Sequence, residues 1–300
     1  MSNILITGGT GTFGQALSKF LLNKVDINKI VIYSRDEQKQ EKMANEFSSN
    51  ENFSKFRFLI GDVRDKQRLK LALKGIDLVV HAAALKIVPA SEYNPMEYIK
   101  TNVIGTQNLI EAIVEIDRMP SWPIRTVLIS TDKAVNPVNL YGATKLCAEK
   151  LFVAANNINP DKARFIALRY GNVANSRGSV IPIFKEHFDQ GKPLPITDMD
   201  MTRFWITIDF AIEFVWDNLI FQQDYTKVHY PKMASFRVAD LAKAFYLNKP
   251  NEEAIKIIGV RNGEKIHESI DVGVTSDTND YWLSALDLRN ILIEMGVINV

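Results

Sequence analysis

A short apolar run close to the start of the sequence leads straight into a glycine-rich turn: Asn3-Ile4-Leu5-Ile6-Thr7-Gly8-Gly9-Thr10-Gly11-Thr12-Phe13-Gly14. Residues 3–7 have the apolar, β-branched character of a buried strand, and residues 15–23 have the character of a helix. Glycines permit a tight turn and a close approach of backbone, so a pyrophosphate can rest on the amino end of the helix. A plain tight turn is the alternative, but the flanking strand and helix favour a dinucleotide site. Its expected contacts are Gly8, Thr10, Gly11, Thr12, Phe13 and Gly14.

The alternation of strand and helix continues as far as Tyr170. Further apolar runs with strand character occupy residues 29–33, 56–63, 77–84, 125–130 and 164–170. This alternation is typical of an α/β fold, a Rossmann-like doubly wound parallel sheet with right-handed crossovers. Beyond Val173 the pattern loosens into short strands and helices. We expect an NADP-binding domain over residues 1–173 and a smaller α+β substrate-binding region over residues 174–300, some of whose elements can return to the first core.

Polar residues follow the second expected strand, where the ribose of a dinucleotide would bind: Ser34, Arg35, Asp36 and Lys39. An acidic residue at this place binds the ribose 2′-hydroxyl of NAD, whereas an arginine accommodates the 2′-phosphate of NADP. Because Ser34 and Arg35 come first and Lys39 follows, we favour NADP. Asp36 is a weaker argument for NAD, and it can instead cap the next helix. Arg35 can also be no more than a solvated charge.

The third and fourth strands end in residues that can contact the same cofactor. Asp62 can accept a hydrogen bond from the adenine amino group or cap the following helix, and Val63 can pack on the ring. Three small residues would let backbone lie against the cofactor: Ala82, Ala83 and Ala84. Lys86 follows them and points to the place where cofactor and substrate meet. His81 lies in the apolar run and is expected to be buried with its hydrogen bonds satisfied.

A second informative stretch follows the fifth strand: Ser130-Thr131-Asp132-Lys133-Ala134-Val135-Asn136-Pro137-Val138-Asn139-Leu140-Tyr141-Gly142-Ala143-Thr144-Lys145. Tyr141 and Lys145 are one helical turn apart on one face. We expect the Lys145 ammonium to lower the pKa of the phenol by favouring the phenolate, which would let Tyr141 shuttle a proton. Thr131, Asp132 and Lys133 add a hydroxyl, a carboxylate and an amine at the end of the strand. A loop ion pair is the structural alternative for Asp132 and Lys133.

Composition limits the classes of function. Hydrophobic residues make up 46% of the 300 residues, charged residues 24%, and the net charge is +1, as in an ordinary globular protein with no polyanion-binding surface. Cys147 is the only cysteine, which excludes an intramolecular disulfide and favours a reducing compartment. We expect Cys147 to be a small buried helix residue. No apolar run reaches the roughly 20 residues that span a bilayer, so we expect a cytoplasmic protein without nucleic-acid or membrane partners and without a metal site.

These motifs resemble the extended short-chain dehydrogenase/reductase superfamily in its sugar-nucleotide branch. The resemblance rests on the spacing of the three glycines, on Thr131-Asp132-Lys133 and on Tyr141-x-x-x-Lys145. Within that branch the chain is similar to the inverting UDP-N-acetylglucosamine 4,6-dehydratases of the pseudaminic acid pathway type. The similarity runs from Ile4 to about Glu268 through residues 33–40, 60–65, 81–86, 92–95, 169–173, 176–182 and 201–207. Ile87 stands where the family usually has histidine, and Asn262 where it has proline.

The resemblance implies a tightly bound NADP that is regenerated in each cycle, a UDP-sugar substrate and a homo-oligomer, either a dimer or a hexamer. Tyr141, Lys145 and Thr131 would serve oxidation at C4, Lys133 would remove the C5 proton with a lowered pKa, and Asp132 would protonate the leaving 6-hydroxyl. Hydride return to C6 would complete a dehydration with inversion at C5. Expected substrate contacts are Lys86, Asn172, Arg177, Val180, Thr197, Arg203, Arg261 and Glu264, because arginines in a cleft suit a pyrophosphate.

The resemblance also implies that Asn102 braces the active-site backbone from its helix. Two other functions stay open at this point. A 4-epimerase of the same branch needs Thr131, Tyr141 and Lys145 but no Asp-Lys pair. A non-catalytic NADP-binding scaffold would need none of them, and the five polar residues argue against it.

Overall fold

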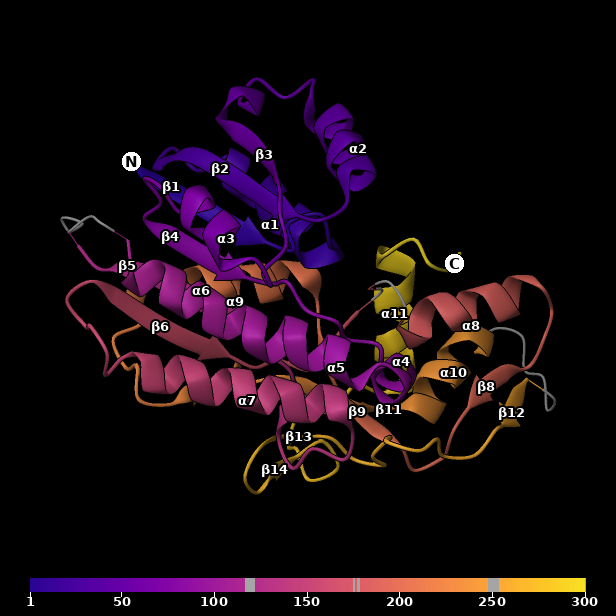
Figure 1. The fold of residues 1–300 in the computed structure, drawn as a ribbon. Helices are drawn as coiled ribbons and strands as arrows, with labels where there is room; N and C mark the ends of the chain where they lie inside the picture. The colour runs from indigo at the N-terminus through magenta and orange to yellow at the C-terminus, as the bar shows by residue number, and fades with distance from the viewer. Residues whose placement is uncertain (117–121, 175, 177–178, 248–253, 300) are drawn as a thin grey trace.

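The computed structural model describes residues 1–116, 122–174, 176, 179–247 and 254–299. Its centre is a parallel sheet with the strand order β10-β6-β5-β4-β1-β2-β3 and with helices on both faces (Figure 1). The strands are β1 (Ser2–Thr7), β2 (Ile27–Ser34), β3 (Phe56–Ile60), β4 (Leu78–His81), β5 (Ile124–Ile129), β6 (Ala163–Leu168) and β10 (Val228–His229). The order reverses between β1 and β4, where doubly wound sheets bind ligands. The expected fold class is confirmed.

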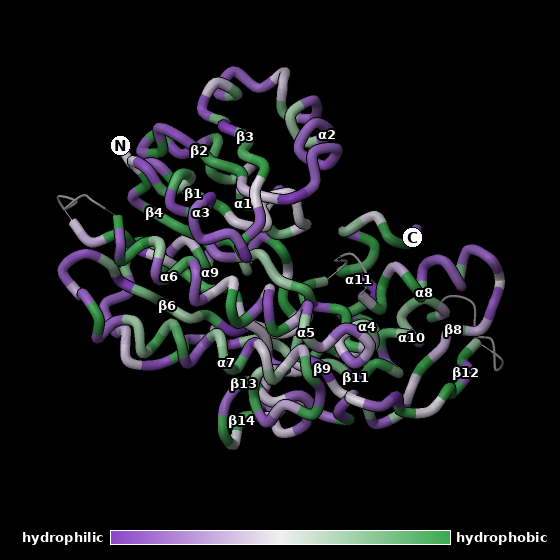
Figure 2. Tube along the Cα trace, viewed as in Figure 1, coloured by the Kyte–Doolittle hydropathy of each residue, from purple (hydrophilic) through white to green (hydrophobic). Residues whose placement is uncertain are grey.

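The central strands are buried on both faces, which explains their unbroken apolar sequences. Ile4 and Ile6 pack into a core with α1 (Thr12–Leu22) and α9 (Ile208–Phe221). Leu5 points to the opposite face and a core with three other helices: α3 (Lys66–Ala72), α6 (Gly105–Val114) and α7 (Leu140–Ala155). Successive strand residues face opposite ways, so a strand covered on both sides is apolar throughout. Figure 2 shows these hydrophobic strands inside and a mainly hydrophilic α2 (Glu37–Phe47) at the periphery.

The second half of the chain builds a separate core and also returns to the sheet. The helix α9 packs on β5 and α1, and β10 pairs with β6 at the edge. The third core lies beyond the carboxyl ends of the strands (Figure 1) and holds α8 (Val180–Asp189), α10 (Val238–Tyr246), α11 (Ala285–Glu294), β8 (Leu194–Ile196), β9 (Thr202–Ile206) and β11 (Ala234–Arg237). The boundary at residue 173 stays a prediction, with α9 and β10 on the sheet of the first region.

Short elements complete the structure. The strand β7 (Asn172–Val173) pairs with β9, which also pairs with β11. In two further sheets, β12 (Ile255–Ile257) pairs with β8, and β13 (Ser269–Asp271) pairs with β14 (Val274–Thr275). The short helices are η1 (Phe53–Lys55), α4 (Val88–Tyr93), α5 (Pro95–Tyr98), the π-helix η2 (Ile99–Ile104) and the 3₁₀ helix η3 (Asp132–Ala134). Within the described ranges, no helix combines the length and the apolar character that a bilayer crossing needs.

Two expectations about single residues have clear outcomes. His81 is 1% exposed, and its ring nitrogens contact the hydroxyls of Thr7 at 2.7 Å and Thr106 at 3.1 Å, which confirms a satisfied buried histidine. The expectation for Cys147 is wrong, because this thiol is exposed. The buried face of α7 includes Ala148, and a neighbour in sequence points about 100° away on a helix.

Candidate active site

The glycine-rich turn between β1 and α1 lies against the backbone that follows β4. Gly8 has a φ of +68°, and a Cβ on it would lie 2.8 Å from the Cα of Ala83, so only glycine fits. The amide of Gly11 donates to the carbonyl of Gly8 at 2.9 Å and closes the turn. Gly11 is the N-cap of α1, and no side chain caps that helix. Its first amide groups are therefore left to bind an anion, and the turn fits the pyrophosphate of a dinucleotide.

At the end of β2, the carboxylate of Asp36 is used inside the protein. It accepts a hydrogen bond from the amide of Lys39 at 3.0 Å and caps α2, and the Lys39 ammonium lies 2.6 Å from it. The capping alternative for Asp36 is confirmed. The hydroxyl of Ser34 accepts from a glutamine of α2 at 3.0 Å. Arg35 is half-exposed, with Nη1 3.7 Å from Oδ2 of Asp62.

Asp62 and Val63 lie at the end of β3. Asp62 accepts hydrogen bonds from the amide and the guanidinium of Arg64. The capping alternative for Asp62 is wrong, because Asp65 caps α3. Val63 is buried and packs against Gly105 of α6. Contacts of Asp62 and Val63 with an adenine ring stay a prediction.

Thr131, Asp132 and Lys133 lie at the carboxyl end of β5. Oγ1 of Thr131 donates to Oδ1 of Asp132 at 2.8 Å, and Nζ of Lys133 donates to the same oxygen at 3.1 Å. Oδ2 of Asp132 is buried and has no hydrogen-bond partner among the described residues. Burial raises the pKa of Asp132, and the partly opposing charge of Lys133 does not cancel this. Asp132 is therefore disposed to hold a proton, and Oδ2 is its oxygen without a hydrogen-bond partner among the described residues.

Lys133 lies between two carboxylates. Its Nζ is 3.1 Å from Oδ1 of Asp132, so the loop ion pair is present, and 3.2 Å from Oε1 of Glu268. Burial acts to lower the pKa of Lys133, but the two carboxylates raise it above its ordinary value. The expected lowering of this pKa is wrong. Glu268 was not among the expected site residues, and no local pattern in the sequence singles it out.

Tyr141 and Lys145 are one turn apart in α7, as expected. Nζ of Lys145 donates to the last carbonyl of β5 at 2.7 Å, and burial lowers the pKa of Lys145 to about 8 although Glu149 opposes this. Burial raises the pKa of Tyr141 to about 12, while Lys133 and a hydrogen bond with Thr131 act in the opposite direction. The expectation that Lys145 lowers the pKa of Tyr141 is wrong in this structure, because desolvation of the phenol outweighs the nearby cation, which is Lys133.

Buried polar groups hold α7 beside these residues. The side chain of Asn102 accepts from the amide of Leu85 and donates to its carbonyl, both at 2.9 Å, and it donates to the hydroxyl of Thr144 at 3.0 Å. This confirms the bracing role implied for Asn102. A Cβ at Gly142 would collide with the carbonyl oxygen of Lys133, so only glycine lets the helix begin this close to Lys133.

A buried ion pair joins α7 to the strand β6. Glu149 is completely buried and accepts two hydrogen bonds from the guanidinium of Arg169, at 2.8 and 2.7 Å. It also accepts from the hydroxyl of Ser130 at 2.5 Å. Arg169 in turn donates to the carbonyl of Ile270 in β13 at 3.1 Å. The pair therefore connects α7, the sheet and the C-terminal region.

Several residues expected to contact substrate lie at the carboxyl side of the sheet. Asn172 is in β7, and its Oδ1 is buried without a hydrogen-bond partner within the described part of the chain. Val180 begins α8, and the hydroxyl of Thr197 contacts the sulfur of Met201 at 3.0 Å. Arg177 lies outside the described residues. Substrate contacts of these residues stay a prediction.

The other residues expected to contact substrate differ in how many groups of the protein they already bind. Arg203 is buried, donates to two backbone carbonyls at 2.7 and 3.0 Å, and has Nε 3.9 Å from Oε1 of Glu268. Its guanidinium therefore binds groups inside the protein. The exposed Arg261 uses its backbone amide to donate to the carboxylate of Glu264 at 3.4 Å. Lys86 is exposed between β4 and α4.

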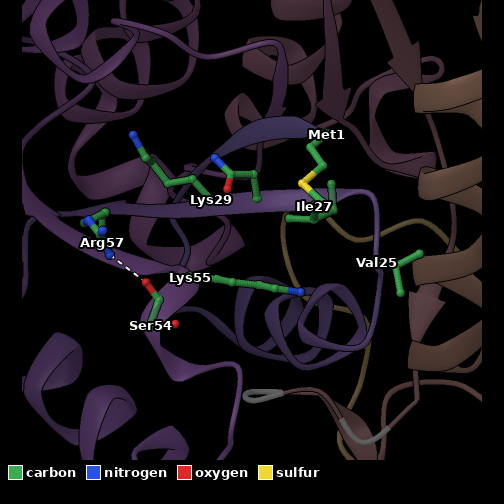
Figure 3. A pocket seen from close by; sticks show the side chains of 8 residues that line it. Met1, Val25, Ile27, Lys29, Ser54, Lys55 and Arg57 are labelled. Atoms are coloured by element: carbon green, nitrogen blue, oxygen red, sulfur yellow. Dashed lines mark hydrogen bonds between the residues drawn. The ribbon is translucent and has the colours of Figure 1, made fainter.

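A hollow at the opposite, amino end of the sheet lies away from these residues. This pocket of about 340 Å³ is lined by Met1, Val25, Ile27, Asn28, Lys29, Ser54, Lys55 and Arg57 (Figure 3). Lys55 and Arg57 there donate to backbone carbonyls of neighbouring turns. These two cations thus bind the protein's own backbone. Among the described residues, no group of three or more histidine, cysteine, aspartate or glutamate side chains is placed to hold a metal ion.

The chain matches known proteins in sequence and in fold. A family model described as "Polysaccharide biosynthesis protein" matches residues 4–281. The UDP-N-acetylglucosamine 4,6-dehydratase (inverting) of Campylobacter jejuni strain 81-176 is 50% identical over 287 residues, which cover 93% of this chain and 81% of that relative. A UDP-glucose 4-epimerase of Rickettsia typhi is 40% identical over 299 residues, covering 96% of this chain and 84% of the relative.

A solved structure shares the fold at lower identity. DesIV, a dTDP-glucose 4,6-dehydratase from Streptomyces venezuelae with NAD and TYD bound, superposes with a TM-score of 0.78 at 21% identity. The match covers 90% of this chain and 88% of DesIV. It shows that the arrangement of sheet, turn and helix described above is shared with that protein.

Proposed function

This chain belongs to the polysaccharide biosynthesis protein family, and from that premise we propose that it is a UDP-N-acetylglucosamine 4,6-dehydratase that inverts C5. It is an enzyme of the hydro-lyase class, and its product is a UDP-2-acetamido-2,6-dideoxy-hexos-4-ulose. The relative from Campylobacter jejuni, with half of its aligned residues identical, carries that name. The fold, the glycine-rich turn and the five polar residues at β5 and α7 all suit this reaction.

The buried carboxyl of Asp132 is the observation that carries the proposal. Its Oδ1 already accepts from Thr131 and Lys133, while Oδ2 has no partner among the described residues. Burial favours the neutral acid by raising the pKa, so a proton on Oδ2 is available for a departing hydroxyl. Oxidation and reduction at C4 alone need no such acid, whereas loss of water from C6 does.

The other residues divide the remaining proton transfers. A nicotinamide cofactor held at the glycine-rich turn would supply the hydride chemistry, uptake from C4 and return to C6. Tyr141 takes the 4-hydroxyl proton while its own phenolic proton passes to the hydroxyl of Thr131, with which it shares a hydrogen bond, and from there to the carboxylate of Asp132. Lys133 exchanges the proton at C5, which is acidic once C4 is a ketone; to take that proton, its ammonium first passes its own to a neighbouring carboxylate. Lys145, buried against the last carbonyl of β5, orients the cofactor beside Tyr141.

Among nicotinamide cofactors we propose NADP, tightly bound and regenerated in each cycle. Arg35 supports this choice, because it is half-exposed at the end of β2 while the competing carboxylate of Asp36 is committed to its helix cap. DesIV holds NAD, so the two dinucleotides need a direct comparison of affinity. We further propose a UDP-sugar substrate, a homo-oligomeric assembly and a cytoplasmic location.

The reaction can be followed by NMR in deuterated water. Incubation of the purified protein with UDP-N-acetylglucosamine and NADP should give a 4-keto-6-deoxy sugar with solvent deuterium at C5. Absence of deuterium at C5 from an active, cofactor-loaded protein would overturn the proposal. The variant Lys133→Ala should still oxidise C4, seen as reduced nicotinamide, but should lose C5 exchange and dehydration.

A 4-epimerase is the second candidate, because the relative from Rickettsia typhi carries that name. Mass spectrometry separates the two activities, since dehydration removes one water and epimerisation leaves the mass of the sugar nucleotide unchanged. The buried Asp132 favours dehydration. A non-catalytic scaffold would bind NADP without turnover of either kind.

A further inference from the structure

Glu268 enters the candidate active site from the C-terminal region of the chain. It directly precedes β13, its side chain is 3% exposed, and its Oε1 lies 3.2 Å from Nζ of Lys133. The same ammonium lies 3.1 Å from Oδ1 of Asp132. The amine of Lys133 is thus fixed from two directions, once by its own loop and once by a residue far along the chain.

The backbone of Glu268 is anchored on both sides. Its amide donates to the hydroxyl of Ser276 at 3.0 Å, and its carbonyl accepts from the amide of Ser276 at 2.8 Å. Ser276 is buried, and its hydroxyl lies 2.6 Å from that of Thr202 in β9. A side chain on such an anchored backbone holds its partner in a defined place.

The segment before Glu268 also binds the catalytic loop. The side chain of Asn139, which caps α7 through Gly142, donates to the carbonyl of Gly263 at 2.7 Å. Nζ of Lys265 donates to the carbonyl of Val135 at 2.5 Å. We call residues 263–268 the strap. The strap therefore contacts both ends of the loop that joins Lys133 to α7.

The charges around Glu268 keep it ionised. Lys133, Lys265 at 3.6 Å and Arg203 at 3.9 Å all face its carboxylate. Burial acts to raise the pKa of Glu268, but these three cations hold it below its ordinary value. Lys133 also interacts electrostatically with Asp132, which raises its pKa, with Arg203, which lowers it, and with Tyr141. Glu268 is therefore the negative charge that balances Lys133 when Asp132 carries a proton.

We propose that Glu268 is a positioning residue of the dehydration, which holds the amine of Lys133 at C5 of the substrate and sets the pH range in which that amine exchanges a proton. The inference rests on the proposed function. Glu268 does not contact the reacting atoms itself; it acts through Lys133. It also places part of the catalytic apparatus on the strap, so that the C-terminal region completes the site on the sheet.

Two substitutions test this inference in the full-length protein. Glu268→Gln removes the charge and keeps the size, so the pKa of Lys133 falls, and the acid limb of the pH profile for C5 deuterium exchange should move about 1 unit lower. Glu268→Asp keeps the charge but moves it one methylene away from Lys133. The acid limb of the pH profile should therefore stay at the same pH, while the rate of C5 exchange falls about 10- to 100-fold. Both variants should still bind NADP and oxidise C4. The control Asp271→Asn removes a charge three residues away that lies 3.7 Å from Arg169, and it should leave the profile unchanged.

An unmoved limb in Glu268→Gln, or an exchange rate within about twofold of the parent in Glu268→Asp, would overturn the inference. Should Glu268→Gln not fold, the rate of Glu268→Asp decides alone. Equal loss of C4 oxidation and C5 exchange in Glu268→Asp would show a general structural role and would also overturn it. Failure of the proposed function looks different, because then the unmodified protein itself incorporates no deuterium at C5.

Discussion

The buried ring of His81 should make the stability of this protein fall as the pH is lowered. Burial lowers the pKa of His81 to about 3, with a smaller contribution from Lys145, whereas the ring titrates near 6.5 in an unfolded chain. Between these values the unfolded chain binds one more proton than the folded protein, so the free energy of unfolding decreases as pH falls. Each pH unit costs about 1.4 kcal/mol. From about pH 7 to about pH 5 the loss from this one residue is about 2 kcal/mol.

Urea unfolding followed by circular dichroism at the two pH values measures this loss. The matched variant His81→Gln keeps a donor and an acceptor for the hydroxyls of Thr7 and Thr106 but cannot titrate. It should be less stable at about pH 7, by about 1–3 kcal/mol for an imperfectly satisfied buried group. Its dependence on pH should be shallower by about 2 kcal/mol over the same interval. Equal pH dependence in both proteins would refute the reasoning, because other groups would then carry the whole slope.

Three further substitutions follow from the geometry. Gly8→Ala should weaken binding of the nicotinamide cofactor at least about tenfold in a fluorescence titration and lower the melting temperature. The control Gly75→Ala, at a φ of +73° with nothing within 4 Å, should show only the backbone cost of about 1–2 kcal/mol. Asn102→Ala leaves the partly buried amide and carbonyl of Leu85 without their partner and should cost about 1–3 kcal/mol for each of them in urea unfolding. A smaller loss would mean that water replaces the amide. Glu149→Leu alone leaves the buried charge of Arg169 unpaired and should lower the free energy of unfolding by about 3–5 kcal/mol. Adding Arg169→Met should restore much of that stability. Additive losses of stability in this double-mutant cycle would contradict a coupled pair.

Local features of the sequence determine much of this fold. Apolar β-branched runs separated by helical segments predict a sheet covered on both faces, because a strand buried on both sides has no place for a polar residue. The glycines between β1 and α1 predict a turn against other backbone, and Gly8 confirms it. The four-residue spacing of Tyr141 and Lys145 places both on one face of α7. Each of these inferences depends on residues within one or two turns of each other.

Burial and long-range charge decided what the sequence pattern could not. The resemblance implies a lowered pKa for Lys133, but the carboxylates of Asp132 and Glu268 raise it. The sequence predicts a lowered pKa for Tyr141, but burial of the phenol raises it. Electrostatic interactions depend on distance and on the exclusion of water, and neither is a property of neighbouring residues in a sequence.

The sequence by itself determined the elements, the glycine-rich turn and the identity of the residues at the end of β5, since these follow from side-chain type and short spacing. Only the tertiary structure decided that Glu268 lies beside Lys133 and that the strap closes on the catalytic loop. Chain folding brings these segments together through β13, β14 and the buried Ser276, and no periodicity links them in sequence. A contact between distant segments depends on the packing of everything between them, so it becomes visible only in three dimensions.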